Sequence, residues 1–157
     1  MTRIPYNQER YIELLKHEQD LKNQKKFLMD EYREEFNELV QYDGAVRDHM
    51  FWQKRESIRS ILEDFLNEKM DVTEFRGCVS NLRYQSSVLS EEFKLKLLSN
   101  SEELKNFQPN ENLERLHEFL RDLFLECEKY YDEDENEKFY ISIQNIFGEF
   151  QNALHEE

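Results

Sequence analysis

The clearest helical pattern and the densest charge of the chain occur together in NLERLHEFLRDLFLECEKYYDEDENEKFYISIQNIFGEFQNA, which runs from Asn112 to Ala153. In both of its halves apolar residues recur at spacings of three and four, the period of one buried helix face. They are Leu113, Leu116, Leu120, Leu123, Phe124, Cys127 and Tyr131 in the first half, and Phe139, Ile143, Ile146, Phe147, Phe150 and Leu154 in the second. The acids at 132–135 are too charged to bury and few enough to lay two helices side by side. The stretch therefore predicts an antiparallel helical hairpin.

The first helix of this hairpin carries a row of four acids, Glu114, Glu118, Asp122 and Glu126, spaced four residues apart. Like charges at this spacing destabilise a helix by roughly 0.2–0.5 kcal/mol per pair. One interpretation is a helix that tolerates mild repulsion in water. The other is an anionic surface that awaits a cationic partner. On the second interpretation the row binds the partner together with the turn acids Asp132, Glu133, Asp134 and Glu135.

Composition favours a single helical domain over residues 1–157. A chain of this length buries roughly 68–70% of the surface that its unfolded form exposes. Twelve Phe and eight Tyr supply a core in spite of 36% charged residues. Three Gly and two Pro leave few breaks, which suits long helices. The fold class we predict is all-α, an antiparallel bundle of five to six helices with a long N-terminal helix.

The net charge of −14 lies almost wholly in the C-terminal part of the chain. Residues 1–60 carry 11 basic and 12 acidic side chains, whereas residues 61–157 carry 10 basic and 23 acidic ones. Such a surface repels nucleic acid and anionic lipid and favours a basic protein partner. Because no uninterrupted apolar run exceeds three residues, we expect a soluble protein of the cytoplasm, or of an organelle stroma or matrix.

Residues 1–60 are expected to form a long helical arm or a hairpin. From Asn7 to Tyr42 the apolar spacing predicts one long helix, which the pair Asp43-Gly44 would end, since Gly supplies the left-handed backbone of a helix C-terminus. Such a helix could pair with a second chain, so a homodimer through this segment is one of the expected partnerships.

A second helix is predicted from Val46 to Asn67. Trp52 lies off its apolar stripe, and two interpretations stay open: a half-buried edge residue, or an anchor for a partner, because Trp is enriched at interface hot spots.

Three features mark the next helices. Asp71 is the expected N-cap of a helix in which Gly77 suggests the close approach of another helix. Ser90 is the expected cap of a further short helix, and Pro109 breaks the chain before the hairpin.

The strong catalytic motifs are missing. The chain has no Gly-rich phosphate loop, no Cys-x-x-Cys pair and no His-x-x-x-His pair. Glu114-x-x-His117 matches half of a di-iron carboxylate site, but a second copy on a facing helix is absent. We therefore expect no cofactor, no bound metal and no enzymatic activity.

One resemblance goes beyond these patterns. The segment ILEDFLNEKMDVTEF, from Ile61 to Phe75, resembles the opening of the colicin D-type immunity proteins, in which a helix ending in Phe-Leu precedes a polar turn and a second helix led by Phe. The pattern Leu120-x-x-Leu123-Phe124-x-x-x-Glu128-x-Tyr130, the acidic turn and the closing helix are similar to the family's C-terminal half. The likeness covers roughly residues 61–157, which we expect to form an acidic helical bundle; residues 1–60 lie outside it.

The resemblance implies a small acidic protein that binds the basic nuclease domain of a toxin and blocks its tRNA site. Carboxylates would then occupy positions where Lys and Arg of the toxin expect phosphates. Two other classes of function stay open. One is a subunit or assembly factor of a larger, possibly organellar, complex held by the N-terminal helix, which predicts exposed apolar surface between Tyr11 and Val40. The other is a helical metalloenzyme, which predicts that metal is lost on Glu114→Ala.

Overall fold

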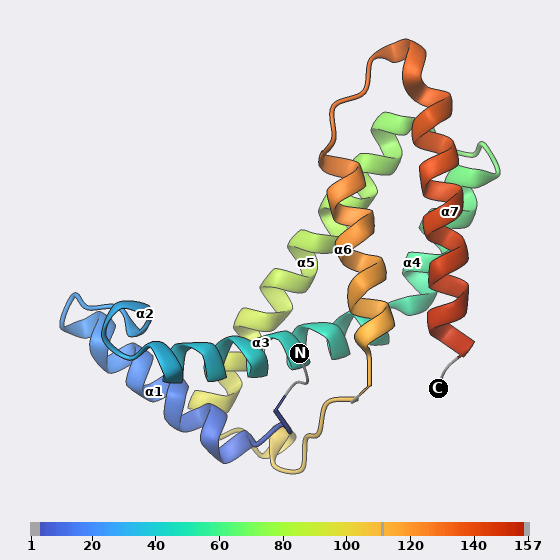
Figure 1. Cartoon of the computed structure of the whole chain (residues 1–157). Coiled ribbons are helices and arrows are strands. Elements are labelled where there is room, and N and C mark those ends of the chain that lie inside the picture. Colours follow the sequence, from blue (N-terminus) through green and yellow to red (C-terminus); the bar gives the residue numbers. More distant parts are fainter. Residues whose placement is uncertain (1–3, 111, 156–157) are drawn as a thin grey trace. The chain divides into compact units, whose positions relative to one another are not determined.

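A computed structural model describes residues 4–110 and 112–155 of the chain (Figure 1). Over these residues the chain forms seven α-helices and two short 3-10 turns, and no strand. The all-α class is thereby confirmed, with more helices than the five to six predicted. Two compact units can be separated, one made of residues 4–50 and 87–110, the other of residues 51–86 and 112–155. The division near residue 60 that the sequence suggests differs from this one, because each unit is built from two separate pieces of chain.

The first unit contains α1 (Gln8–Asn23), α2 (Leu28–Glu31), most of α3 (Arg33–Gln53), the end of α5 (Val72–Leu98) and the 3-10 turn η1 (Glu102–Leu104). The Asn7 side chain caps α1 by accepting the Arg10 backbone N–H at 3.1 Å. The core of the unit is formed by Tyr6, Tyr11, Leu14, Leu15, Leu21, Leu28, Leu39, Tyr42, Val46, Phe93 and Leu97.

The single helix predicted from Asn7 to Tyr42 is wrong, because the chain breaks after α1 and again at Tyr32. At the first break Lys25 takes a left-handed backbone, with φ 59°, and the Lys26 N–H donates to the Leu21 carbonyl at 2.8 Å. This is a Schellman helix end in which Lys stands where Gly is usual. Residues 22–26 have no apolar side chain to bury, so the helix gains nothing by continuing through them.

Gly44 does not end a helix, contrary to prediction. The buried residues Leu39, Tyr42 and Val46 follow one another at helical spacing on both sides of it, and α3 runs on to Gln53. A helix-interior Gly costs about 1 kcal/mol relative to Ala. The burial of the flanking apolar residues offsets this cost.

The second unit contains α4 (Arg55–Leu66), the first part of α5, α6 (Glu114–Glu128), the 3-10 turn η2 (Glu133–Glu135) and α7 (Asn136–His155). The predicted hairpin is confirmed: α6 and α7 lie side by side, and α7 also packs on α4 (Figure 1). The core of the unit is formed by Phe51, Ile58, Leu62, Phe65, Phe75, Val79, Leu82, Leu113, Leu116, Phe119, Leu120, Leu123, Phe139, Ile143, Ile146 and Phe150.

Of the local features predicted for α3 to α5, one is confirmed and three are wrong. Asp71 caps α5, its Oδ1 accepting the Glu74 N–H at 2.8 Å, as predicted. The helix predicted from residue 46 to 67 is interrupted at Lys54, and Ser90 begins no helix because it lies inside α5. Gly77 marks no close approach, since a Cβ at this position would meet nothing within 4 Å.

None of the helices in residues 4–110 and 112–155 combines the length and the apolar character needed to cross a bilayer.

Candidate functional site

The predicted row of acids lies on α6, the helix of the second unit with the most acids, five against the two bases Arg115 and Arg121. Glu114 and Glu118 are exposed, and Asp122 is half-buried. Within the described part of the chain no ion pair is formed by Glu114 or Glu118, and the ion pair of Asp122 is with its neighbour Arg121, at 3.7 Å. The repulsion along this part of the row is therefore left largely uncompensated.

A further acid, Glu149, joins this surface from α7. The pKa of Glu149 is raised, first by the partial burial of its carboxyl group, then by a hydrogen bond to Asp122 and the negative charges of Asp122 and Glu118. Three carboxyl groups from two helices thus crowd together. Sequence reasoning missed Glu149, because the predicted hairpin places α7 beside the row without fixing which face of α7 turns toward it.

Glu126, the fourth acid of the row, does not lie on the exposed surface. It is 6% exposed, accepts a hydrogen bond from the Tyr131 hydroxyl and pairs with Lys129 Nζ at 3.0 Å. Burial alone would raise the pKa of Glu126, but hydrogen bonds from Tyr131, Lys129 and Ser142 together lower it below its usual value. Glu126 therefore fastens the end of α6 to the following turn, and we leave it out of the candidate surface.

The turn acids are partly engaged within their own turn. The Glu135 side chain accepts the Asp132 N–H at 3.2 Å and pairs with Lys138 at 3.2 Å. These hydrogen bonds, the Asp132 backbone contact first, lower the pKa of Glu135. Asp132 and Glu135 thus form a capping box at the start of η2, the turn that leads into α7. Glu133 and Asp134 stay exposed.

Carboxylate oxygens of Asp132, Asp134 and Glu135 lie within 4.8 Å of one another. No other group of three potential metal ligands occurs among residues 4–110 and 112–155, and Glu114 and His117 belong to none. Because the capping box already accounts for two of these three acids, their proximity does not indicate a metal centre.

Trp52 packs against the core of the second unit and is half-buried. The Arg55 guanidinium lies 4.2 Å from the centre of its ring, and Arg55 Nη1 donates to the Trp52 carbonyl at 3.0 Å. One ring face is thus covered from within the chain. The geometry fits a half-buried edge residue, while the role of Trp52 as a partner anchor stays a prediction.

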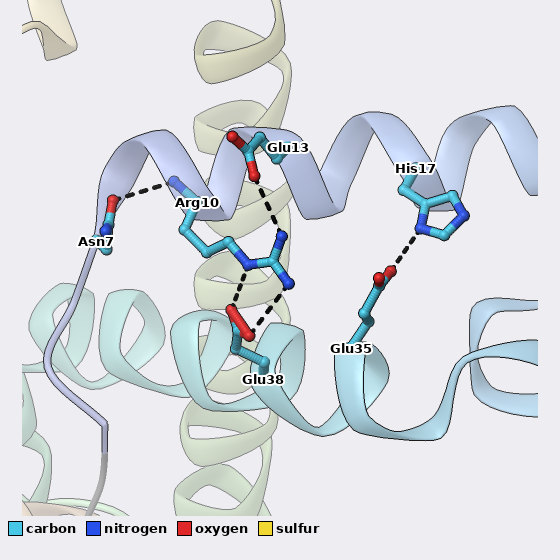
Figure 2. A network of polar contacts seen from close by, with 6 residues as sticks. All are labelled: Asn7, Arg10, Glu13, His17, Glu35 and Glu38. Atoms are coloured by element: carbon cyan, nitrogen blue, oxygen red, sulfur yellow. Dashed lines mark hydrogen bonds and ion pairs between the residues drawn. The ribbon is translucent and has the colours of Figure 1, made fainter.

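In the first unit, acids on and beside α1 are paired with basic side chains. Figure 2 shows Arg10 of α1 held by two acids, with Nε 2.7 Å from Glu38 of α3 and Nη1 3.1 Å from Glu13. The hydrogen bonds to Glu38 and Glu13, in that order, raise the pKa of Arg10. His17 Nδ1 lies 2.5 Å from Glu35 in the same view. These acids have a basic partner, in contrast to Glu114 and Glu118 of α6.

Comparison of the chain with models of protein families, with curated proteins and with solved structures found no match.

Proposed function

We propose that this chain is a binding protein for a basic protein. The contact surface would be formed by Glu114, Glu118 and Asp122 of α6 with Glu149 of α7, named here the acidic face. The observation that carries the proposal is the crowding of Glu118, Asp122 and Glu149, where burial first, and then the hydrogen bond to Asp122 and the two negative charges, raise the pKa of Glu149. A partner that inserts Lys or Arg side chains among these carboxylates would replace repulsion with charge-assisted hydrogen bonds.

The sharpest form of the proposal is an inhibitor of a basic nuclease, as the resemblance to the colicin D-type immunity proteins implies. The acidic face offers a series of anionic oxygens along one helix, and such a series can occupy cationic positions where a nuclease holds phosphates. The proposed mechanism is thus competition for the substrate site, with no chemistry performed by this chain.

The test is capture of partners on the purified, tagged chain at low salt, followed by elution with rising salt. The wild type should retain a basic protein, and the double variant Glu118→Lys/Asp122→Lys should lose it. The matched control is Glu31→Lys/Glu34→Lys, which makes the same charge change at two exposed acids of the first unit. Equal retention by both double variants would contradict the acidic face as the contact surface.

A second candidate function, a subunit of a larger assembly, is favoured by a different observation. The exposed large apolar residues include Phe27, Met29, Tyr32 and Val40, which lie in the segment where this hypothesis predicts them. In that case the double variant Glu118→Lys/Asp122→Lys would still retain the captured protein, and the variant Phe27→Asp would not.

A further inference from the structure

We propose that the turn between α1 and α2 is a self-association site, in which an apolar pocket of one copy of the chain receives Phe27 and Met29 of a second copy. This site, named here the apolar tip, lies in the first unit. It does not depend on the acidic face or on the proposed function.

The pocket has a volume of about 390 Å³. Phe27, Leu28, Met29 and Phe36 provide its apolar lining, and the charged residues Glu18, Lys22 and Asp30 complete it. An apolar cavity of about 150 Å³ already takes up benzene. The pocket therefore has room for an aromatic ring and part of a Met side chain.

Two of the side chains that line the pocket are exposed, and an ordered turn holds them. Phe27 is 62% exposed and Met29 is 44% exposed, whereas Leu28 between them is buried. The Schellman end of α1 fixes the backbone just before Phe27, with the Lys25 N–H donating to the Lys22 carbonyl at 2.9 Å. The burial of Leu28 fixes the other side. The two large apolar side chains are thus presented to solvent at little further cost in conformational entropy on binding.

The charge around the tip selects a second copy as the occupant. Residues 18–30 carry three acids, Glu18, Asp20 and Asp30, and three bases, Lys22, Lys25 and Lys26, so this segment is neutral in a chain of net charge −14. Two such chains repel each other through most of their surface. At the tip they can approach, and across a two-fold axis Lys22 of each copy can lie near the acids of the other, as an isologous contact requires. A strongly basic or strongly acidic partner would find no net field here.

The experiment is sedimentation equilibrium of the full chain from micromolar to millimolar concentration, at about 0.1 M and about 1 M salt, where the Debye length falls from about 10 Å to about 3 Å. The wild type should form dimers, and more of them at high salt, because salt screens the repulsion between the two acidic chains while the apolar contact persists. Binding of a basic protein to the acidic face has the opposite salt dependence, so the two proposals can fail separately.

Three variants locate the contact. Phe27→Asp should weaken dimerisation by about tenfold or more, because a charge would enter an apolar pocket. Lys22→Glu should weaken it at low salt and less at high salt. The matched control Leu95→Asp makes the same kind of change at a 66% exposed residue of α5. Leu95→Asp should dimerise with an affinity close to that of the wild type.

Each opposite result overturns the proposal. The proposal is wrong if the wild-type chain stays monomeric at both salt concentrations. It is also wrong if Phe27→Asp dimerises as readily as the wild type. A dimer that dissociates with added salt would show that charge rather than the apolar tip holds it. Because Phe27 is mostly exposed, its substitution leaves the core of the first unit untouched, and circular dichroism of the variant should match the wild type.

Discussion

The hydrogen bond from Tyr131 to the buried carboxylate of Glu126 should stabilise the second unit in a manner that depends on pH. Tyr131→Phe removes the hydroxyl donor and keeps the ring, with its edge contact to Phe139 at 5.5 Å between ring centroids. A hydrogen bond to a charged group contributes about 1.5–3 kcal/mol. Because Glu126 is 6% exposed, water can replace the lost donor only in part. We expect the free energy of unfolding to fall by about 1.5–3 kcal/mol at pH 7.

The pH dependence follows from the lowered pKa of Glu126. A carboxyl group with a lowered pKa in the folded state adds stability above its unfolded pKa of about 4.3, and this stability is lost as pH falls through the folded pKa. In Tyr131→Phe the pKa of Glu126 should rise, since burial then acts with fewer hydrogen bonds against it. The stability difference between wild type and variant should therefore be full at pH 7 and shrink as the pH falls below about 4.

The assay is urea denaturation followed by the fluorescence of Trp52, the one Trp of the sequence, which packs on the core of this unit. The matched control is Tyr140→Phe, which removes a neutral hydrogen bond to the Leu66 carbonyl, 2.7 Å long. It should cost about 0.5–1.5 kcal/mol at every pH. A loss in Tyr131→Phe that is the same at pH 7 and at low pH would refute the role assigned to the Glu126 carboxylate.

Three further predictions concern helix stability. Glu68→Gly should raise the free energy of unfolding by about 1 kcal/mol, because Glu68 has φ 60° at the end of α4, a conformation that Gly adopts without strain. The control Glu63→Gly, inside α4, should lower the free energy of unfolding by about the same amount. Thermal unfolding distinguishes the two signs. Gly77→Ala should stabilise α5 by about 0.5–1 kcal/mol, since the new methyl group meets nothing, and a destabilised variant in urea denaturation would contradict this. Glu149→Gln should stabilise the chain at pH 7 by about 0.2–0.5 kcal/mol. Because the pKa of Glu149 is raised, the folded chain is favoured while this carboxyl group is protonated and loses that stability as the pH rises through its pKa. Near pH 3 the group is protonated in the wild type, so unfolding curves of Glu149→Gln and wild type should coincide there.

The apolar period of the sequence determined the fold class, the α6–α7 hairpin and most of the residues that form the core of the second unit. This succeeded because a helix of the second unit buries one face along its whole length, and that face can be identified within the helix itself. The cap at Asp71 was equally local, since a side chain three residues away supplies the hydrogen bond. The exposed positions of Glu114 and Glu118 followed from the same period.

Tertiary structure decided where helices end. Three ends place Lys25, Glu68 and Asn100 in a left-handed backbone, although none of them is Gly, and α3 passes through a Gly. The polar run at residues 22–26 marks the end of α1 in the sequence itself, but elsewhere a helix ends or continues according to which other helices lie beside it.

Tertiary structure also decided the composition of the acidic face. Glu126 left it by turning toward Tyr131, and Glu149 entered it from α7. The contact of Glu126 is local, since Tyr131 lies five residues along the chain, whereas the position of Glu149 depends on how α6 and α7 are rotated about their axes when they pack. The spacing of acids along one helix cannot report that rotation, because it arises from side-chain contacts between segments distant in sequence.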